Sequence, residues 1–307
     1  MAVMETEKRS AVLITGGCGF VGRSLGQLLQ RHGYPVISVD VAPPGTRSND
    51  TSRDITDVSQ LCAVFQRSRI DAIVHLAAIL PTVAQREPLR ATRVNVQGSL
   101  HLLEMARQFG VQRFIFGSSL SVYGTCPGDQ TVSERDPAAP EDLYGAAKLY
   151  VEQLGEAYRE TCGTEFVSLR IGRVVGPGAR STTSAWRSEI FESLHAADAK
   201  IEIPYAESER VLLVHVDGVA RMLFELLRAE HLRHTVYNAG CESVIVGELK
   251  SIVQRLNPRL QVNLAEESVV GNPRRVDWSR FAAEFGFKMV PIFEQLAKSA
   301  SEQKAES

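Results

Sequence analysis

Short apolar runs alternate with helical patterns through most of the chain. Residues 11–15 (AVLIT) form a short apolar run, as in a strand that is covered on both faces. Leu25, Leu28 and Leu29 then recur at helical spacing up to Arg31. Because connections between parallel strands are right-handed, this alternation predicts a parallel sheet with its functional groups at the carboxyl ends of the strands. Further strands are predicted at 36–39, 72–76, 113–116, 165–170 and 236–239, helices at 91–109, 184–196 and 246–256, and a polar, frayed tail at 299–307.

A glycine-rich turn joins the first strand to the first helix. Gly16, Gly19 and Gly22 are spaced to permit a tight turn, a close approach of the backbone to a pyrophosphate, and close packing of the helix on the sheet. The N-terminus of the helix adds partial positive charge for the phosphates. The turn therefore predicts a dinucleotide site, with Gly16, Gly19, Phe20 and Val21 among its contacts.

The second strand ends in Asp40, about 20 residues after the glycine turn. A carboxylate at this position hydrogen-bonds the adenosine ribose hydroxyls and repels a 2′-phosphate, which favours NAD over NADP. A plain turn aspartate after a strand is the simpler interpretation. Arg47, a short distance downstream, leaves the preference between the two cofactors open.

Tyr144 and Lys148 are four residues apart in a helical pattern, so both side chains are expected on one face. An ordinary tyrosine has a pKa of ~10. A cation at ~5 Å, with an effective dielectric near 20, contributes roughly 3 kcal/mol, which would lower that pKa by about two units. Tyr144 would then be a candidate general base for an alcohol proton. Taken alone, the spacing favours a buried tyrosine beside a solvated lysine; the motifs around it change this balance.

Composition narrows the class of protein. The chain of 307 residues exceeds one average domain and can bury a substantial core. A net charge of -2 argues against nucleic-acid and anionic-membrane partners. Five scattered cysteines without a C-x-x-C pair indicate free thiols in a reducing compartment and no metal site. Without a signal-peptide pattern or a run of ~18 apolar residues, a cytoplasmic protein is expected.

Several motifs follow one another in a fixed order over about the first 150 residues. They are Thr15-Gly16-x-x-Gly19-x-x-Gly22, Asp54-Ile55, His75-Leu76-Ala77-Ala78, Asn95-Val96-x-Gly98, Ser118-Ser119-x-x-Val122-Tyr123-Gly124 and Tyr144-x-x-x-Lys148. As an ordered set they resemble the extended short-chain dehydrogenase/reductase family, the NAD-dependent epimerase/dehydratases. The resemblance implies an α/β fold, a Rossmann-type doubly wound parallel sheet with a smaller C-terminal substrate-binding lobe. The expected domains are an NAD-binding Rossmann domain at 1–175 and a mainly substrate-binding lobe at 176–307, from which about 210–240 returns to the sheet.

The resemblance also implies roles for residues along the cofactor site. Asp54 and Ile55 would flank the adenine of NAD. Asn95 would order the central helix and an active-site water. The residues that would line the cofactor cleft are Leu76, Ala77 and Ala78.

The same resemblance implies the catalytic residues. Ser119 would be the catalytic hydroxyl, with Ser118 in support and Tyr123 in a packing role. Tyr144 would be the base, and Lys148 would hold the nicotinamide ribose and lower the tyrosine pKa. Chemically, the Tyr144 phenolate would take the hydroxyl proton while the neighbouring carbon gives hydride to the nicotinamide. Ser119 would hydrogen-bond the same oxygen from within ~3 Å.

Candidate substrate residues follow in the next stretch of the chain. Thr182 and Thr183 are donors for a substrate hydroxyl or carboxylate, or else an N-cap for the next helix. Arg173, Arg180 and Arg210 are candidate anion anchors, because a guanidinium suits carboxylate or phosphate. Arg173 is favoured because it follows a strand end. It stands where many nucleotide-sugar enzymes of the family have asparagine, and this departure argues against a sugar diphosphate as the substrate. A small, anionic substrate is expected.

The resemblance and the residues together predict an NAD-dependent oxidoreductase that acts as a homodimer on a secondary alcohol of a small sugar acid or hydroxy acid. The first alternative is an NAD-dependent epimerase that acts on a sugar or nucleotide sugar. The second is a non-catalytic NAD-sensing protein, although degenerate relatives of that kind usually lose the Tyr or the Lys. No metal is expected.

Overall fold

The computed structural model describes residues 10–41, 50–126, 128–179, 184–196 and 198–302, which form two compact units that share the chain. Unit 1 comprises the described residues up to 117, with 150–168 and 223–235; unit 2 comprises 118–149, 169–222 and the described residues from 236 on. The predicted functional boundary at residue 175 stays a prediction. Four elements pass from one unit into the other: β5 (Arg113–Ser119), α6 (Leu143–Cys162), β7 (Glu165–Ile171) and α8 (Val216–Arg228).

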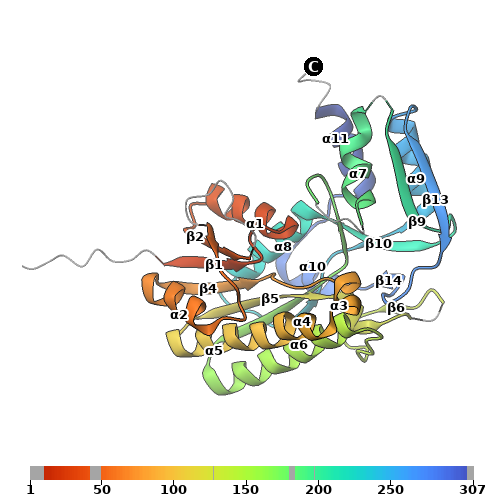
Figure 1. Cartoon of the computed structure of the whole chain (residues 1–307). Helices are drawn as coiled ribbons and strands as arrows, with labels where there is room; N and C mark the ends of the chain where they lie inside the picture. The colour runs from red at the N-terminus through yellow and green to blue at the C-terminus, as the bar shows by residue number, and fades with distance from the viewer. Residues whose placement is uncertain (1–9, 42–49, 127, 180–183, 197, 303–307) are drawn as a thin grey trace, which may run out of the picture. The chain divides into compact units, whose positions relative to one another are not determined.

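A seven-stranded sheet has the strand order β11-β7-β5-β4-β1-β2-β3 (Figure 1). Strand pairs β1–β2, β2–β3, β1–β4 and β4–β5 are parallel. This order is that of a doubly wound dinucleotide-binding sheet, so the predicted Rossmann-type α/β fold is confirmed. The remaining strands of this sheet are β1 (Ala11–Thr15), β2 (Val36–Asp40), β3 (Asp50–Ser52), β4 (Ile70–His75) and β11 (Val236–Asn238).

Helices of unit 1 cover both faces of this sheet. On one face, α1 (Phe20–Arg31) lies near α8, since the rings of His32 and Phe224 are 4.5 Å apart. On the other face, α2 (Val58–Arg67) packs on α5 (Ser99–Phe109), and Tyr158 of α6 donates to Glu104 of α5 at 3.3 Å. The two-sided cover explains why β1 and β4 are apolar runs rather than alternating patterns.

The helix predicted at 91–109 is interrupted. It consists of α4 (Pro88–Thr92), a π-helical segment (Arg93–Gly98) and α5, and α3 (Pro81–Arg86) precedes it. A Cβ on Gly98 would lie 2.7 Å from the Ile55 side chain, so this turn needs glycine to pack. Apolar periodicity does not separate α from π geometry over a single turn, which is why the sequence predicted one continuous helix.

Unit 2 contains three small sheets around its own apolar core, which includes Val175, Trp186, Ile201, Val211 and Leu249. The sheets are β12 (Glu242–Ile245) with β10 (Arg210–His215) and β8 (Arg173–Val175), then β13 (Gln261–Glu267) with β9 (Lys200–Tyr205), and β14 (Arg275–Val276) with β6 (Thr131–Val132). Its helices are α7 (Trp186–Glu192), α9 (Val246–Leu256), α10 (Ser279–Phe285), α11 (Ile292–Glu302) and two 3-10 turns, Leu120–Tyr123 and Ser193–His195.

The prediction of a frayed tail at 299–307 is wrong for its first four residues. Helix α11 continues to Glu302, because Leu296 and Ala300 on one of its faces are buried in the unit 2 core. Residues 303–307 lie outside the described residues. Among the described residues, no helix is both long and apolar enough to span a membrane.

Candidate active site

The glycine turn of unit 1 depends on the absence of side chains. Gly16 has a φ of 70°, in the left-handed region, and a Cβ there would lie 2.7 Å from the backbone nitrogen of Ala77. A Cβ on Gly22 would lie 2.3 Å from the Gly16 carbonyl oxygen. Helix α1 begins at Phe20 without a side-chain cap, so its first N–H groups are suited to binding phosphate. The turn therefore fits a dinucleotide pyrophosphate.

Asp40 is tied to this turn. The backbone N–H of Cys18 donates to Asp40 Oδ2 at 3.0 Å, and Gly16 N–H donates to the Val39 carbonyl at 2.9 Å. The bonds hold the carboxylate at the end of β2, where an adenosine ribose is bound in this fold. Arg47, which kept the choice of cofactor open, lies outside the described residues.

A buried chain of hydrogen bonds fixes the end of β4. His75 is fully buried, with Nδ1 2.6 Å from Thr15 Oγ1 and Nε2 2.8 Å from Ser99 Oγ. Ser99 in turn donates its hydroxyl proton to the Asn95 carbonyl at 2.7 Å. Because Ser99 uses its only proton for the Asn95 carbonyl, His75 Nε2 is the donor to the Ser99 hydroxyl oxygen. The chain joins β1, β4 and the π-helical segment.

The side chain of Asn95 holds the backbone that follows β4. Its Oδ1 accepts from the Ile79 N–H at 2.7 Å and its Nδ2 donates to the Ile79 carbonyl at 2.9 Å. Asp54 accepts from the Thr56 N–H at 2.8 Å, and Ile55 is buried in the core of unit 1. The predicted cofactor residues of unit 1 lie on turns and strand ends, in the first turn of α1 (Phe20 and Val21) and in the π-helical segment (Asn95). These residues are Gly16, Gly19, Phe20, Val21, Asp40, Asp54, Ile55, Leu76, Ala77, Ala78 and Asn95.

In unit 2, the structure brings the predicted catalytic residues together. Ser119, the last residue of β5, is hydrogen-bonded to Tyr144 in the first turn of α6. Lys148 is 4% exposed, and its Nζ lies 5.5 Å from the centre of the Tyr144 ring. Ser119 Oγ also accepts a hydrogen bond from the Ser121 N–H and lies 3.1 Å from the Ser121 hydroxyl; the first distance is likewise 3.1 Å. The Ser121 hydroxyl in turn accepts from the Asn272 amide at 3.4 Å.

The acidity of Tyr144 differs from the sequence prediction. Burial raises the pKa of Tyr144 to about 12, and the Asp142 carboxylate acts in the same direction; Arg187 and the bond from Ser119 oppose the rise. The prediction that Lys148 lowers this pKa to about two units below ~10 is therefore wrong for the protein alone. The free energy lost when the phenolate leaves water is larger than the attraction it gains from Arg187. The guanidinium of Arg187 acts against this rise in the pKa of Tyr144.

One arginine, Arg187, lies close enough to this tyrosine for its charge to act on the phenol, and a second, Arg173, acts in turn on Arg187. Arg173 begins β8, and its guanidinium carbon lies 5.6 Å from the centre of the Tyr205 ring. Arg187 lies in the first turn of α7, and burial followed by the Arg173 charge lowers its pKa to about 10. Arg173 Nη1 and Arg187 Nε are buried without a hydrogen-bond partner in the described part of the chain.

Arg210, another predicted substrate residue, is not part of this cluster. Leu213 pairs with Arg173, and Arg210 lies three positions before Leu213 on β10, so Arg210 points to the opposite face of this sheet. Thr182 and Thr183, like Arg180, lie outside the described residues.

Arg187 was not among the residues predicted from the sequence, although the sequence contains a signal for it. Ile190 and Phe191, three and four residues further along α7, are fully or almost fully buried. An arginine at that spacing falls on the buried face of the helix, where a cation needs a partner. The predicted packing role of Tyr123 agrees with its surroundings, since its buried hydroxyl accepts from Arg170 at 2.8 Å and lies 2.9 Å from Asn238 Oδ1.

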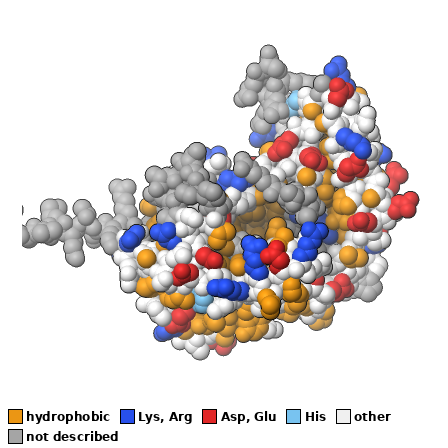
Figure 2. Space-filling view, viewed as in Figure 1, with side chains coloured by type: hydrophobic (Ala, Val, Ile, Leu, Met, Phe, Trp, Pro, Cys, Tyr) orange, Lys and Arg blue, Asp and Glu red, His pale blue; other side chains and the backbone are white. Residues whose placement is uncertain are grey.

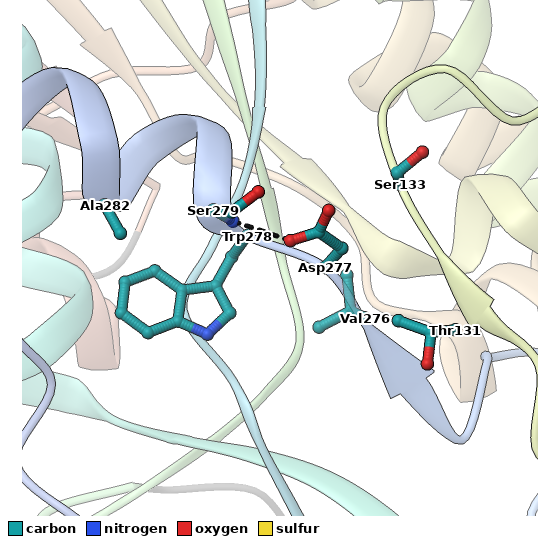
Figure 3. Close-up of a pocket in the computed structure, with 7 residues that line it drawn as sticks. All are labelled: Thr131, Ser133, Val276, Asp277, Trp278, Ser279 and Ala282. Carbon is teal, nitrogen blue, oxygen red and sulfur yellow. Dashed lines mark hydrogen bonds between the residues drawn. The ribbon is translucent and has the colours of Figure 1, made fainter.

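A separate cavity of about 680 Å³ lies elsewhere in unit 2 (Figure 3). Thr131 and Ser133 form one side, while the Trp278 ring and the Asp277 carboxylate, which accepts from the Ser279 N–H at 2.8 Å, form the other. It contains none of the predicted site residues. Within the described ranges, no three His, Cys, Asp or Glu side chains are placed to hold a metal ion.

Unit 1 has the strand order of a dinucleotide-binding fold, and unit 2 contains a cluster of serine, tyrosine and lysine. Residues 12–240 match the NAD dependent epimerase/dehydratase family, and the chain belongs to that family. The match to this family confirms the predicted family and its cofactor, NAD.

Similar proteins catalyse more than one reaction. The chain is 33% identical to the UDP-glucose 4-epimerase of Lacticaseibacillus casei over 54% of this chain and 52% of that protein. It is 31% identical to the uronate dehydrogenase of Pseudomonas syringae over 58% of this chain and 64% of that protein. It thus aligns with only about half to two thirds of these relatives' lengths. In fold, it is similar to the L-threonine dehydrogenase of Phytophthora infestans, with a TM-score of 0.87, 24% identity, and 97% and 100% of the two chains covered.

Proposed function

We propose that this protein is an NAD-dependent dehydrogenase that oxidises a secondary alcohol of a small sugar acid or hydroxy acid. The observation that carries the proposal is the hydrogen bond between Ser119 and Tyr144, with Lys148 one helical turn further on. A phenol and a hydroxyl that already share a hydrogen bond can both reach one substrate oxygen. The uronate dehydrogenase relative supports an acid as the substrate.

NAD binding is assigned to the turns and strand ends of unit 1. The N–H groups at Gly19, Phe20 and Val21 would bind the pyrophosphate, and Asp40 would bind the adenosine ribose. Asp54, Ile55 and residues 76–78 would contact the adenine and line the cleft, while Asn95 keeps that backbone in place. When bound, NAD supplies the nicotinamide ring that accepts hydride.

The residues of unit 2 would handle the proton. Tyr144, as the phenolate, takes the proton of the substrate hydroxyl, and Ser119 donates a hydrogen bond to the same oxygen. Lys148 would hold the nicotinamide ribose and stabilise the phenolate. Since the pKa of Tyr144 is about 12 in the protein alone, the phenol is protonated at neutral pH, and oxidation is expected to accelerate as the pH rises.

The test is NADH formation from D-galacturonate, D-glucuronate, L-threonine and 3-hydroxybutyrate. We expect NADH to accumulate with at least one of them, and Tyr144→Phe to lower kcat by about 10²–10⁴. Ser119→Ala is expected to lower it by about 10²–10³. Tyr150→Phe is the matched control, because Tyr150 lies on the same helix but is 52% exposed. Full activity in Tyr144→Phe would exclude the proposed base.

Epimerisation is the second candidate, because a relative that is 33% identical is a UDP-glucose 4-epimerase. An epimerase returns the hydride to the opposite face of the same carbon. Incubation with UDP-glucose or UDP-glucuronate would then give an epimeric product while NAD stays unchanged. Net NADH without an epimer excludes this candidate.

The predicted homodimer and cytoplasmic location also remain proposals. Leu89 of α4 (88% exposed), Leu100 of α5 and Tyr150 of α6 are exposed apolar side chains of unit 1. Figure 2 shows that hydrophobic side chains gather on part of the visible surface. A symmetric dimer would bury exposed apolar surface of this kind. Light scattering on wild type and Leu89→Glu tests it: a monomeric wild type contradicts the dimer.

A further inference from the structure

We propose that Arg173 and Arg187 form one anion-binding site of unit 2, which takes the carboxylate of the substrate. The inference rests on the proposed function and deepens it, because it assigns the acid group of the substrate to a pair of residues. Arg187 has no counterpart among the residues that the motifs predicted.

The position of the two arginines comes from neighbouring elements. Arg173 is the first residue of β8, and the chain runs from β8 towards α7, where Arg187 is the second residue. The Gly176 N–H donates to the Arg187 carbonyl at 3.1 Å, so the start of α7 is fastened to the end of β8. Trp186 is 3% exposed and stands edge-on to Tyr205 at 6.2 Å, which fixes the helix against β9.

The charges of this pair are not balanced within the described residues. Arg173 has the face of Tyr205 beside it, but no carboxylate forms an ion pair with either guanidinium in this part of the chain. Each arginine also has a buried nitrogen without a hydrogen-bond partner there. Two like charges in a partly desolvated place repel each other, and the lowered pKa of Arg187 reflects this. A bound anion would satisfy both the charges and the nitrogens.

Carboxylate is the anion that best suits the position. Planar guanidinium groups bind carboxylate or phosphate through paired hydrogen bonds. Arg187 lies close enough to Tyr144 for its charge to act on the phenol that receives the alcohol proton. An anion held there is therefore close to the reacting carbon, as in a hydroxy acid or uronic acid. In a nucleotide sugar the phosphates are carried on the anomeric carbon, so a phosphate at this position is the competing outcome.

The experiment compares acids with neutral analogues on the NAD-loaded protein. Calorimetric titrations use 3-hydroxybutyrate against 3-hydroxybutyramide, D-galacturonate against D-galactose, and inorganic phosphate. The variants are Arg187→Gln, Arg187→Lys and Arg173→Gln. Arg221→Gln is the matched control, since Arg221 also lies over an aromatic ring, Phe287, at 4.8 Å. Melting temperature and NAD affinity show whether each variant is folded.

We expect wild type to bind at least one acid, and each Arg→Gln variant to bind it about tenfold or more weakly. The affinity of Arg187→Lys for the acid is expected to lie between those of wild type and Arg187→Gln, and the affinity of Arg221→Gln is expected to equal that of wild type. Acid binding that is unchanged in the folded variants, neutral analogues that bind as well as acids, or a site that prefers phosphate would each overturn the proposal. No NADH formation despite arginine-dependent acid binding contradicts only the dehydrogenase; NADH formation with unchanged acid binding contradicts only the arginine site.

Discussion

Tyr144 stands between two opposite charges at the start of α6 and α7. The carboxylate of Asp142, two residues away, raises its pKa, whereas the guanidinium of Arg187 lowers it. Asp142 also accepts from the Gly145 N–H at 2.6 Å, and so stabilises the first turn of the helix that carries the tyrosine. The same carboxylate thus positions the phenol and makes it less acidic.

This balance predicts a specific pH effect. In Asp142→Asn, the amide oxygen can still accept the Gly145 N–H, but the negative charge is lost. The pKa of Tyr144 is then lower, more phenolate is present at any pH below it, and kcat/KM is expected to rise by about tenfold. The pH profile of kcat/KM is the measurement, and its alkaline midpoint is expected to move to lower pH.

Asp136→Asn is the control for this effect. Asp136 also accepts hydrogen bonds from a turn in unit 2, at Ser133, but its carboxylate is not among the groups that shift the pKa of Tyr144. An Asp142→Asn profile that coincides with that of Asp136→Asn would mean that the carboxylate does not set the acidity of the phenol.

Individual residues differ in how far the sequence could predict them. The resemblance of the ordered motifs to a known family predicted that Ser119 and Tyr144 share one site, and in the structure the Ser119 hydroxyl acts on the Tyr144 phenol. The Tyr144–Lys148 spacing predicted a lowered pKa for Tyr144, whereas the pKa is raised. The reason is that burial of the phenol depends on residues far away in the chain. Arg187 was missed for the same reason: its neighbour Arg173 comes from another element.

At the scale of elements, Arg113 joins three parts of unit 1. At the start of β5, it forms an ion pair with Glu165 of β7 and donates to the carbonyls of Leu226 and Leu227, both at 2.9 Å. These carbonyls belong to the last turn of α8, which has no partners of its own within the helix. One guanidinium therefore connects two strands and caps a helix.

Arg113→Ala is expected to lower the free energy of unfolding by about 2–4 kcal/mol, because it leaves the partly buried Glu165 carboxylate without its cation and several carbonyls without a donor. Denaturant unfolding monitored by circular dichroism is the measurement. Arg228→Ala is the control, because Arg228 lies in the last turn of α8, the helix that Arg113 caps. The ion pair between Arg228 and Glu225 is partly exposed and contributes about 0.5 kcal/mol to stability. Equal losses in the two variants would argue against the capping role.

Elements were predicted where pattern and propensity agree. The strand at 11–15 and the helix at 246–256 have the predicted bounds. The π-helical turn at Arg93–Gly98 was not predictable, because it arises where Gly98 packs under Ile55 and Asn95 bonds to Ile79. Both contacts join segments distant in sequence, and apolar spacing along one helix contains no information about them.

At the scale of the whole molecule, the chain crosses between its two units at five points, after Gly117, Leu149, Ser168, Met222 and Thr235. Two of the crossings lie inside the helices α6 and α8, which cannot be half unfolded without losing their central hydrogen bonds. We therefore expect one cooperative thermal transition, with equal calorimetric and van't Hoff enthalpies. We assign NAD to unit 1, so NAD is expected to raise the melting temperature of that single transition. At an NAD concentration of a hundred times its Kd, the free energy of unfolding should increase by about 2.7 kcal/mol. Two resolved transitions in scanning calorimetry, of which NAD moves only one, would show that the crossings do not couple the units.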